Sequence, residues 1–209
     1  RYGSDEHLEQ FASKLISGEW VGANGMTEPE TGSDCYNLST TAERKGDVYI
    51  LNGRKSMITN APVADMFIIY ATVNKAKGFM GVTAFLVEKD TPGLEVGPPF
   101  HKMGLKTAPM SMLHLNDCEI PVANRLGNEG NGVAIFKHSM TWERGCILAS
   151  YIGTMERQLE ESIRFASKRV QYGQPIGKYQ SVSNRIVDIK LRLEPSRALL
   201  YKAGWGHSQ

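Results

Sequence analysis

The spacing of apolar residues changes near residue 130 of this 209-residue chain, and no single type of secondary structure fits both sides of that point. Before it, short runs rich in Val, Ile, Phe and Tyr alternate with turn signals such as Pro92-Gly93, a pattern typical of a β-barrel or sandwich. From Asn131 onward, apolar residues recur with helical spacing over roughly ten turns, a length usual only in bundles. The sequence therefore predicts an α+β protein, in which a β-domain precedes the start of an antiparallel helix bundle.

The β-region is expected to contain a hairpin around Asn52-Gly53, which lies between two apolar runs. Asn-Gly is a strong hairpin signal because both central residues of such a turn must accept a positive φ. We therefore expect residues 48–52 to form one strand and residues 55–59 to return beside it. Other runs rich in β-branched and aromatic residues predict further strands. They are residues 66–73, 82–88, 94–96 and 112–115.

A short helix is expected near the N-terminus. Apolar residues on one face predict it over residues 5–17, with Ser4 or Asp5 as its N-cap and Gly18 at its end. Because the chain starts without Met and stops inside an apolar helical pattern, we expect it to be a piece of a longer polypeptide.

The long C-terminal helical pattern is interrupted once. Gly173 and Pro175 should end the first helix, and a second helix should begin at Gln180. Pro195 falls inside this second pattern, where it should kink the helix or leave one carbonyl unpaired.

Charge and cysteine content exclude several classes of protein. The chain has 24 basic and 22 acidic residues, well mixed, with a formal net charge of +2, which gives no electrostatic case for nucleic acid or an anionic membrane. No apolar run is long enough to cross a bilayer, and no basic-then-apolar leader is present. Three distant cysteines lack disulfide or metal spacing, as do the histidines, so we expect a cytoplasmic protein without a metal site.

Two polar segments are expected to form a pocket, Met26-Thr27-Glu28-Pro29-Glu30-Thr31-Gly32-Ser33-Asp34 and Met57-Ile58-Thr59-Asn60. The predicted hairpin would bring Thr27 and Thr59 to one end of a small sheet. Two hydroxyls and nearby backbone N–H groups suit a flat heteroaromatic ligand better than a metal. Either threonine taken alone would more often be an ordinary strand-end residue.

These segments resemble the middle β-domain of the flavin-dependent acyl-CoA dehydrogenase superfamily in the order Thr-Glu-Pro, Gly-Ser-Asp, Asn-Gly-x-Lys and Ile-Thr-Asn. Longer stretches narrow the resemblance to members that oxidise prolyl groups tethered to carrier proteins; these are residues 58–65, 142–146 and 180–194. The resemblance implies the end of an N-terminal helical domain at 1–18, a middle β-domain at 19–126 and the first part of a C-terminal helical bundle at 127–209. It also implies FAD and a homotetramer.

The resemblance assigns flavin contacts to both segments. Thr27 and the backbone of Met26 would meet the pyrimidine edge of the flavin, and Thr59 would lie beside its N5. Met57 and Ile58 would pack at the same place, where relatives commonly carry an aromatic residue instead of Met57.

The resemblance also implies contacts with phosphate groups. Ser33 would lie near the pyrophosphate of the cofactor and the pantetheine arm of the substrate, and the N–H groups of residues 31–33 could form a small phosphate-binding nest. Arg169 and Tyr172 would reach the diphosphate and adenine of a FAD held mainly by a neighbouring subunit, with Gln180 at its adenosine half. A cation at a helix C-terminus would also explain Arg169, but it would not explain the Tyr-Gly-x-Pro-Ile sequence around Tyr172.

Glu143 is the expected catalytic base. It follows Trp142 and precedes an apolar run, surroundings that would raise the pKa of a carboxyl group into the range useful for a base. The alternative is a helix-surface glutamate paired with Arg144 or Lys137. The resemblance favours the base, because one branch of the family carries its glutamate at this helix position, whereas another carries it on a later helix outside this chain. Arg144 would contact the substrate.

The implied reaction is dehydrogenation of an acyl thioester, in which a base removes the proton next to the carbonyl while hydride passes to the flavin. The narrower resemblance implies an L-prolyl group on the phosphopantetheine arm of a peptidyl carrier protein, oxidised to a pyrroline or pyrrole-2-carboxyl thioester for a secondary metabolite. Two alternatives remain. One is a dehydrogenase of short or branched acyl-CoA, and the other is a catalytically silent flavin-fold protein that serves assembly.

Overall fold

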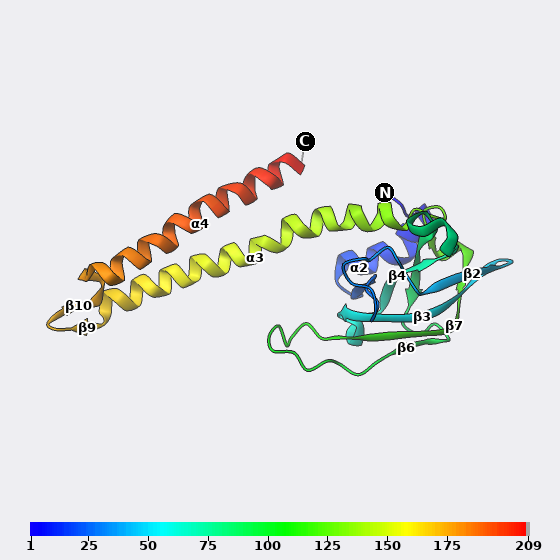
Figure 1. The fold of residues 1–209 in the computed structure, drawn as a ribbon, viewed down its shortest axis with the longest axis horizontal. Coiled ribbons are helices and arrows are strands. Elements are labelled where there is room, and N and C mark those ends of the chain that lie inside the picture. Colours follow the sequence, from blue (N-terminus) through cyan, green and yellow to red (C-terminus); the bar gives the residue numbers. More distant parts are fainter. Residues whose placement is uncertain (208–209) are drawn as a thin grey trace. The chain divides into compact units, whose positions relative to one another are not determined.

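The computed structural model describes residues 1–207 (Figure 1). Contacts divide the chain into two compact units, a β-unit over Arg1–Lys137 and a helical unit that begins at His138. The division falls inside helix α3 (Gly132–Lys168), because Ile135 near its start is buried among residues of the β-unit. The first residues of the long helix therefore belong with the sheet.

The β-unit is built on one eight-stranded sheet in the order β6-β7-β3-β2-β4-β5-β8, with β1 paired to β4. The β1 pairing is parallel, as is a single bridge between β2 and β4, and the other pairings are antiparallel. This confirms the predicted β-domain. The strands are β1 (Gly22–Gly25), β2 (Thr41–Lys45), β3 (Val48–Thr59), β4 (Met66–Thr72), β5 (Val82–Glu88), β6 (Leu94–Val96), β7 (Met110–Pro121) and β8 (Arg125–Leu126). Short 3-10 helices are η2 (Ala61–Val63), η3 (Lys75–Gly81) and η4 (Val122–Asn124).

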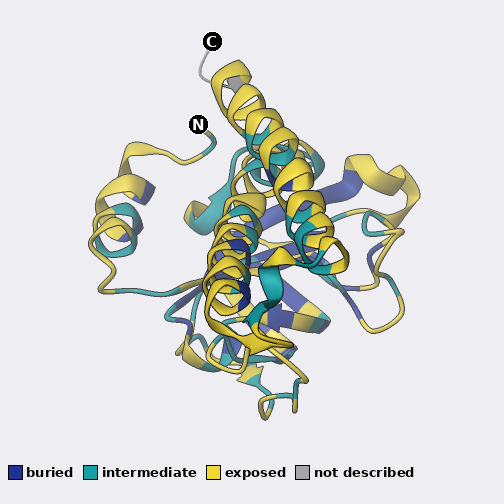
Figure 2. Ribbon diagram, turned by 90° about the vertical axis from the view of Figure 1, so that its left-hand side faces the viewer, coloured by how far each residue is buried: buried dark blue, intermediate teal, exposed yellow. Residues whose placement is uncertain are grey.

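The core of the β-unit lies along the central strands, which Figure 2 shows in dark blue. Tyr49 and Phe85 are fully buried there, with ring centroids 4.9 Å apart in an edge-on arrangement. Burying side chains of this size contributes about 1.5–3 kcal/mol each. The sheet is thus the stable frame on which its connecting segments are held.

The hairpin expected at Asn52-Gly53 is wrong, because β3 runs straight through these residues as one strand. The Asn52 side chain instead accepts from the backbone N–H of Asp117 (2.8 Å) and donates to its carboxylate (2.9 Å) across to β7. Gly53 is needed because a Cβ there would lie 2.5 Å from the hydroxyl oxygen of Thr40. The actual hairpin turn is Gly46-Asp47, between the paired residues Lys45 and Val48.

The N-terminal helix starts and ends as predicted. Ser4 caps it by accepting from the backbone N–H of His7, whose ring nitrogen accepts from the Ser4 N–H in return, and Gly18 ends it with φ +76°. Its middle is a π-helical segment, η1 (Leu8–Ala12), between α1 (Asp5–His7) and α2 (Ser13–Ser17), which the sequence did not indicate.

The helical unit pairs α3 with α4 (Gln180–His207) side by side (Figure 1). Leu159 and Leu193 are buried between them, and the Arg197 guanidinium lies 2.6 Å from the Glu156 carboxylate. Pro195 lies within α4 without ending it, and having no N–H it cannot bond the carbonyl one turn earlier. This confirms the predicted start of an antiparallel bundle. The connection contains β9 (Val170–Gln171), β10 (Gln174–Pro175) and η5 (Ile176–Lys178).

Candidate active site

A bulge near the end of β3 forms the centre of the candidate site. Lys55 pairs with Leu113 of β7 and Ile58 pairs with Ser111, so Ser56 and Met57 together oppose a single residue. Met57 has φ +58° and its side chain is 61% exposed, whereas Ile58 is buried. Left-handed backbone at a non-glycine residue stores about 1–3 kcal/mol of strain and is found mostly at functional sites.

The bulge brings the two predicted segments together. The Ser56 N–H, turned away from β7, donates to the carbonyl of Thr27 at 2.9 Å. Thr59 follows three residues later at the end of β3, where it is exposed. Thr27 and Thr59 therefore lie at the same end of the sheet, although a bulge rather than a hairpin puts them there.

A buried ion pair underlies this segment. The Lys55 ammonium donates to Glu28 Oε1 (2.9 Å) and to the carbonyl of Met26 (3.2 Å), and neither charged side chain is more than 1% exposed. The Glu28 carboxylate also accepts from the backbone N–H groups of Ser39 (2.6 Å) and Thr40 (2.9 Å). Two charges thus fix the path of the chain on both sides of Thr27.

Both members of the pair are charged at neutral pH. Burial lowers the pKa of Lys55 from 10.5 to about 8, and Glu28 keeps it from falling further. Burial also opposes ionisation of Glu28, but the charge of Lys55 and the hydrogen bonds from Thr40 and Ser39 outweigh it and lower its pKa. Sequence reasoning missed this pair, although Glu28 and Lys55 stand inside the motifs Thr-Glu-Pro and Asn-Gly-x-Lys.

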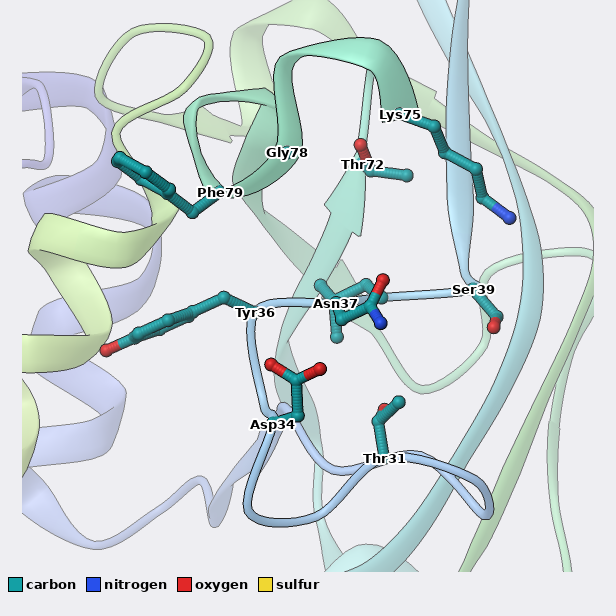
Figure 3. Close-up of a pocket in the computed structure, with 10 residues that line it drawn as sticks. Thr31, Asp34, Tyr36, Asn37, Ser39, Thr72, Lys75, Gly78 and Phe79 are labelled. Atoms are coloured by element: carbon teal, nitrogen blue, oxygen red, sulfur yellow. The ribbon is translucent and has the colours of Figure 1, made fainter.

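A cavity of about 540 Å³ opens between the loop after Thr27 and the loop after β4 (Figure 3). Its walls include Thr31 and Asp34, which flank the predicted residue Ser33, itself exposed. Within the described chain, the buried hydroxyl oxygens of Thr31 and Thr72 have no hydrogen-bond partner. Such groups ask for an explanation, and a polar ligand would supply one.

Glu143 and Arg144 lie on α3 in the helical unit, and both are exposed. Arg144 borders a cavity of about 630 Å³ between α3 and α4 that is walled largely by apolar side chains such as Leu148 and Leu200. The apolar enclosure expected around Glu143 is not formed by the residues that the structure describes. Additional protein must cover this face of α3 if Glu143 is to be desolvated.

Arg169, Tyr172 and Gln180 are gathered at the connection between the two long helices. Tyr172 (φ +49°) and Gly173 (φ +75°) are the two turn residues of the β9–β10 hairpin, which leaves the Tyr172 side chain 97% exposed. Arg169 precedes this hairpin and Gln180 begins α4, and both are exposed. Because these three side chains are exposed, they are available to a ligand or to another protein surface.

Among residues 1–207, no group of histidines, cysteines and carboxylates is arranged to hold a metal ion. Over the same residues, no helix combines the length and apolarity that crossing a bilayer requires.

Two family models match the chain. The acyl-CoA dehydrogenase middle domain matches residues 23–118, and the acyl-CoA dehydrogenase C-terminal domain matches residues 130–209. The chain belongs to the acyl-CoA dehydrogenase family. This confirms the resemblance read from its motifs.

Among its relatives, an L-prolyl-[peptidyl-carrier protein] dehydrogenase from Serratia sp. is 50% identical over the whole chain and one from Pseudomonas fluorescens is 48% identical. The structure of PigA with FAD and proline matches with a TM-score of 0.97 and 50% identity over all of this chain and 55% of PigA. The prolyl acyl carrier protein oxidase AnaB matches with a TM-score of 0.95 and 52% identity over 98% of this chain and 54% of AnaB. The chain spans about half the length of the curated relatives it matches, 54% and 55% for the two prolyl dehydrogenases.

Proposed function

We propose that the bulge of β3 binds the flavin ring of FAD. Met57 offers an exposed apolar side chain against which a planar ring can lie, and Ile58 anchors the strand beneath it. The hydroxyls of Thr27 and Thr59, with the backbone at Met26, supply polar groups for the carbonyl and nitrogen acceptors of the ring. The chain therefore fits the cofactor that the PigA structure contains.

We assign the phosphate and adenine contacts to exposed residues of two loops. Ser33 and the N–H groups around it would meet the pyrophosphate and the pantetheine arm of the substrate. Arg169, Tyr172 and Gln180 would serve a FAD held by a neighbouring subunit, because a guanidinium makes paired bonds to phosphate and an exposed phenol ring can stack on adenine. This arrangement requires an oligomer, which we propose to be a homotetramer.

The catalytic step we assign to Glu143 is removal of the proton next to the thioester carbonyl. The proton passes to the Glu143 carboxylate, and Arg144 positions the acyl group from the next position on α3. Bound FAD supplies the oxidant that takes the departing hydride, so the substrate loses one proton and one hydride in each round. One round would give a pyrroline. A second round, after an external electron acceptor has reoxidised the flavin, would give a pyrrole.

The proposed substrate is an L-prolyl group carried on a peptidyl carrier protein, and the place of reaction is the cytoplasm. The observation that carries this proposal is the identity of about half of all residues, 50% and 48%, with two dehydrogenases of that substrate. A dehydrogenase of short or branched acyl-CoA is the second candidate, supported by 37% identity to a short-chain acyl-CoA dehydrogenase of Megasphaera elsdenii.

The decisive experiment incubates the full-length protein with prolyl-loaded carrier protein and, separately, with a panel of acyl-CoAs. Mass spectrometry should find the carrier-bound acyl group lighter by two or by four hydrogens, while the acyl-CoAs stay unchanged. Oxidation of acyl-CoAs alone would favour the second candidate. Oxidation of neither, by a protein that retains FAD, would favour a role in assembly.

A further inference from the structure

We infer that the short helix η3 is a docking surface for the carrier protein that delivers the substrate. The face of the carrier protein that meets η3 would be acidic. The docked face of the carrier protein would contact Lys77 and Met80. The phosphopantetheine arm of the carrier protein would enter the cavity of Figure 3 beside Lys75 and Phe79. This inference rests on the proposed function, because it says where the partner of that reaction binds.

The surface of η3 combines exposed apolar side chains with cations. Phe79 and Met80 are adjacent, and 59% and 60% of their surfaces are exposed. Lys75 and Lys77 accompany them, and η3 contains no acidic residue. Large apolar side chains exposed side by side mark interaction surfaces, and cations around them select a partner of opposite charge.

One wall of the cavity is formed by η3. Lys75, Gly78 and Phe79 lie on this wall and face Thr31, Asp34 and Ser39 across it (Figure 3). Lys77 and Met80 are not among the lining residues, so η3 has an inner side toward the cavity and an outer side toward solvent. A protein seated on the outer side could therefore insert an attached arm on the inner side.

The walls of the cavity carry polar groups that suit a phosphopantetheine arm. A phosphopantetheine arm carries one phosphodiester, one hydroxyl and two amides, so it is rich in hydrogen-bond acceptors. The ammonium of Lys75 suits the phosphodiester. After rotation about χ1, the unpaired hydroxyls of Thr31 and Thr72 can donate to amide oxygens. The wall residue Thr31 also belongs to the segment that begins with Met26 and Thr27.

Hydrogen bonds and close backbone packing hold η3 in one shape. The Asn74 side chain accepts from the Ala76 N–H (3.0 Å), and the Val73 N–H donates to the carbonyl of Gly81 (2.9 Å). A Cβ on Gly81 would lie 2.2 Å from the carbonyl oxygen of Asn74, so the ends of η3 meet closely. A preorganised surface loses less entropy when a partner binds.

The test uses full-length, FAD-loaded protein and the variant Lys77→Glu/Met80→Asp, which alters only the outer side of η3. Its KM for prolyl-loaded carrier protein should rise about tenfold, and the effect should shrink at high salt because the added repulsion is screened. Oxidation of prolyl-pantetheine, which has no protein to dock, should change by less than about twofold on the same grounds. Binding of fluorescently labelled carrier protein, followed by anisotropy, should weaken in parallel.

Lys106→Glu/Met103→Asp is the matched control, since Lys106 and Met103 are an exposed lysine and methionine on another loop of the β-unit. An unchanged KM and anisotropy in the η3 variant, or an equal rise in the control, would overturn the docking surface. If the parent binds the carrier through η3 but oxidises neither thioester, the docking surface stands and the proposed reaction fails. A parent that oxidises prolyl-pantetheine but does not bind the carrier protein would overturn the docking surface alone.

Discussion

Lys55 and Glu28 form an ion pair that water does not reach. The Lys55 ammonium also donates to the carbonyl of Met26, and the Glu28 carboxylate accepts from the backbone N–H of Ser39. Taking two charges out of water is expensive, and a buried pair often adds little net stability over apolar residues of the same size. Its presence under the candidate site is therefore better explained by the backbone position it enforces. We therefore expect the pair to affect the free energy of unfolding and its dependence on pH.

Lys55→Met should lower the free energy of unfolding by about 3–5 kcal/mol, because it leaves Glu28 charged, buried and unpaired. Glu28→Gln/Lys55→Met should recover most of that loss, since no charge then remains in the core. Urea unfolding of the full-length protein measures both. Lys89→Met breaks a solvent-exposed ion pair with Asp65 and should leave the unfolding midpoint nearly unchanged. Equal losses in Lys55→Met and Lys89→Met would contradict the prediction.

The pKa of Lys55, lowered from 10.5 to about 8, also predicts a dependence of stability on pH. Between these two values the unfolded chain keeps a proton at Lys55 that the folded chain has released. The contribution of Lys55 to the free energy of unfolding should therefore rise with pH, by at most about 1.4 kcal/mol per pH unit. Urea unfolding at several pH values should show the parent gaining on Glu28→Gln/Lys55→Met across this window. A constant difference between the two proteins would mean that Lys55 titrates normally.

Glu143→Gln tests the assignment of the base. Glutamine keeps the volume but cannot accept a proton, so FAD should still bind while its reduction by prolyl carrier protein slows by about 10²–10⁴-fold. Glu143→Asp should keep part of the rate. Stopped-flow absorbance of the flavin measures this step directly. Reduction of the glutamine variant within a few-fold of the parent rate would move the base to another helix.

Among the elements, the sequence predicted best where side chains alternate strongly or repeat with helical spacing. Strands β4, β5 and β6 lie where apolar runs put them, and the ends of the N-terminal helix follow its capping residues. Strand β1, Gly-Ala-Asn-Gly, carries almost no side-chain pattern, so only its pairing with β4 makes it a strand. No local signal could have indicated it.

The hairpin predicted at Asn52-Gly53 is wrong because these residues serve contacts with parts of the chain distant in sequence. Asn52 and Gly53 are required at their positions by contacts with residues distant in the sequence. Asn52 hydrogen-bonds to Asp117, and Gly53 leaves room for Thr40. Gly53 has a positive φ and lies close to Thr40, and both features require glycine, as a turn would. For the site, the motifs predicted Thr27 and Thr59, and their roles stay a prediction. The bulge near them is a property of pairing with β7, which the motifs could not indicate.

Gly53→Ala should destabilise the β-unit, because its Cβ would come within 2.8 Å of three atoms of Thr40 and its φ of +150° is strained for alanine. An overpacked core site of this kind loses about 1–3 kcal/mol. Gly32→Ala is the control, since its Cβ would meet nothing within 4 Å and its φ is ordinary. Thermal unfolding of the two variants should differ by several degrees on that basis. Similar melting temperatures would show that Thr40 moves aside without loss.

The helical unit exposes several large apolar side chains in the single chain. Trp142, Leu148, Tyr151, Leu199 and Tyr201 are each at least 52% exposed in the single chain. We expect faces of this kind to be covered in the native protein. Residues that bind a cofactor from a neighbouring subunit would add a functional reason for assembly.

We expect the full-length protein to be a homotetramer, organised as a dimer of dimers with closed symmetry. Light scattering of the FAD-loaded protein should give about four times the mass of one polypeptide at micromolar concentration, as closed symmetry of that order requires. Arg169→Ala should weaken FAD retention while leaving the mass unchanged. A FAD-saturated monomer would contradict both the assembly and the role of Arg169.

The bulge at Ser56 and Met57 also sets the parity of the strand. In an unbroken strand, inward positions are separated by even numbers, so residues 55, 57 and 59 would share one face. The extra residue makes the interval from Lys55 to Ile58 odd, and this is why Ile58 points into the core and Thr59 out of it. Deletion of Ser56 would make this interval even again, so a regular strand would still point Ile58 into the core and Thr59 out of it. The bulge, with its left-handed Met57 and the hydrogen bond from Ser56 to Thr27, would be lost. The position of the proposed site therefore depends on this bulge as much as on the side chains around it.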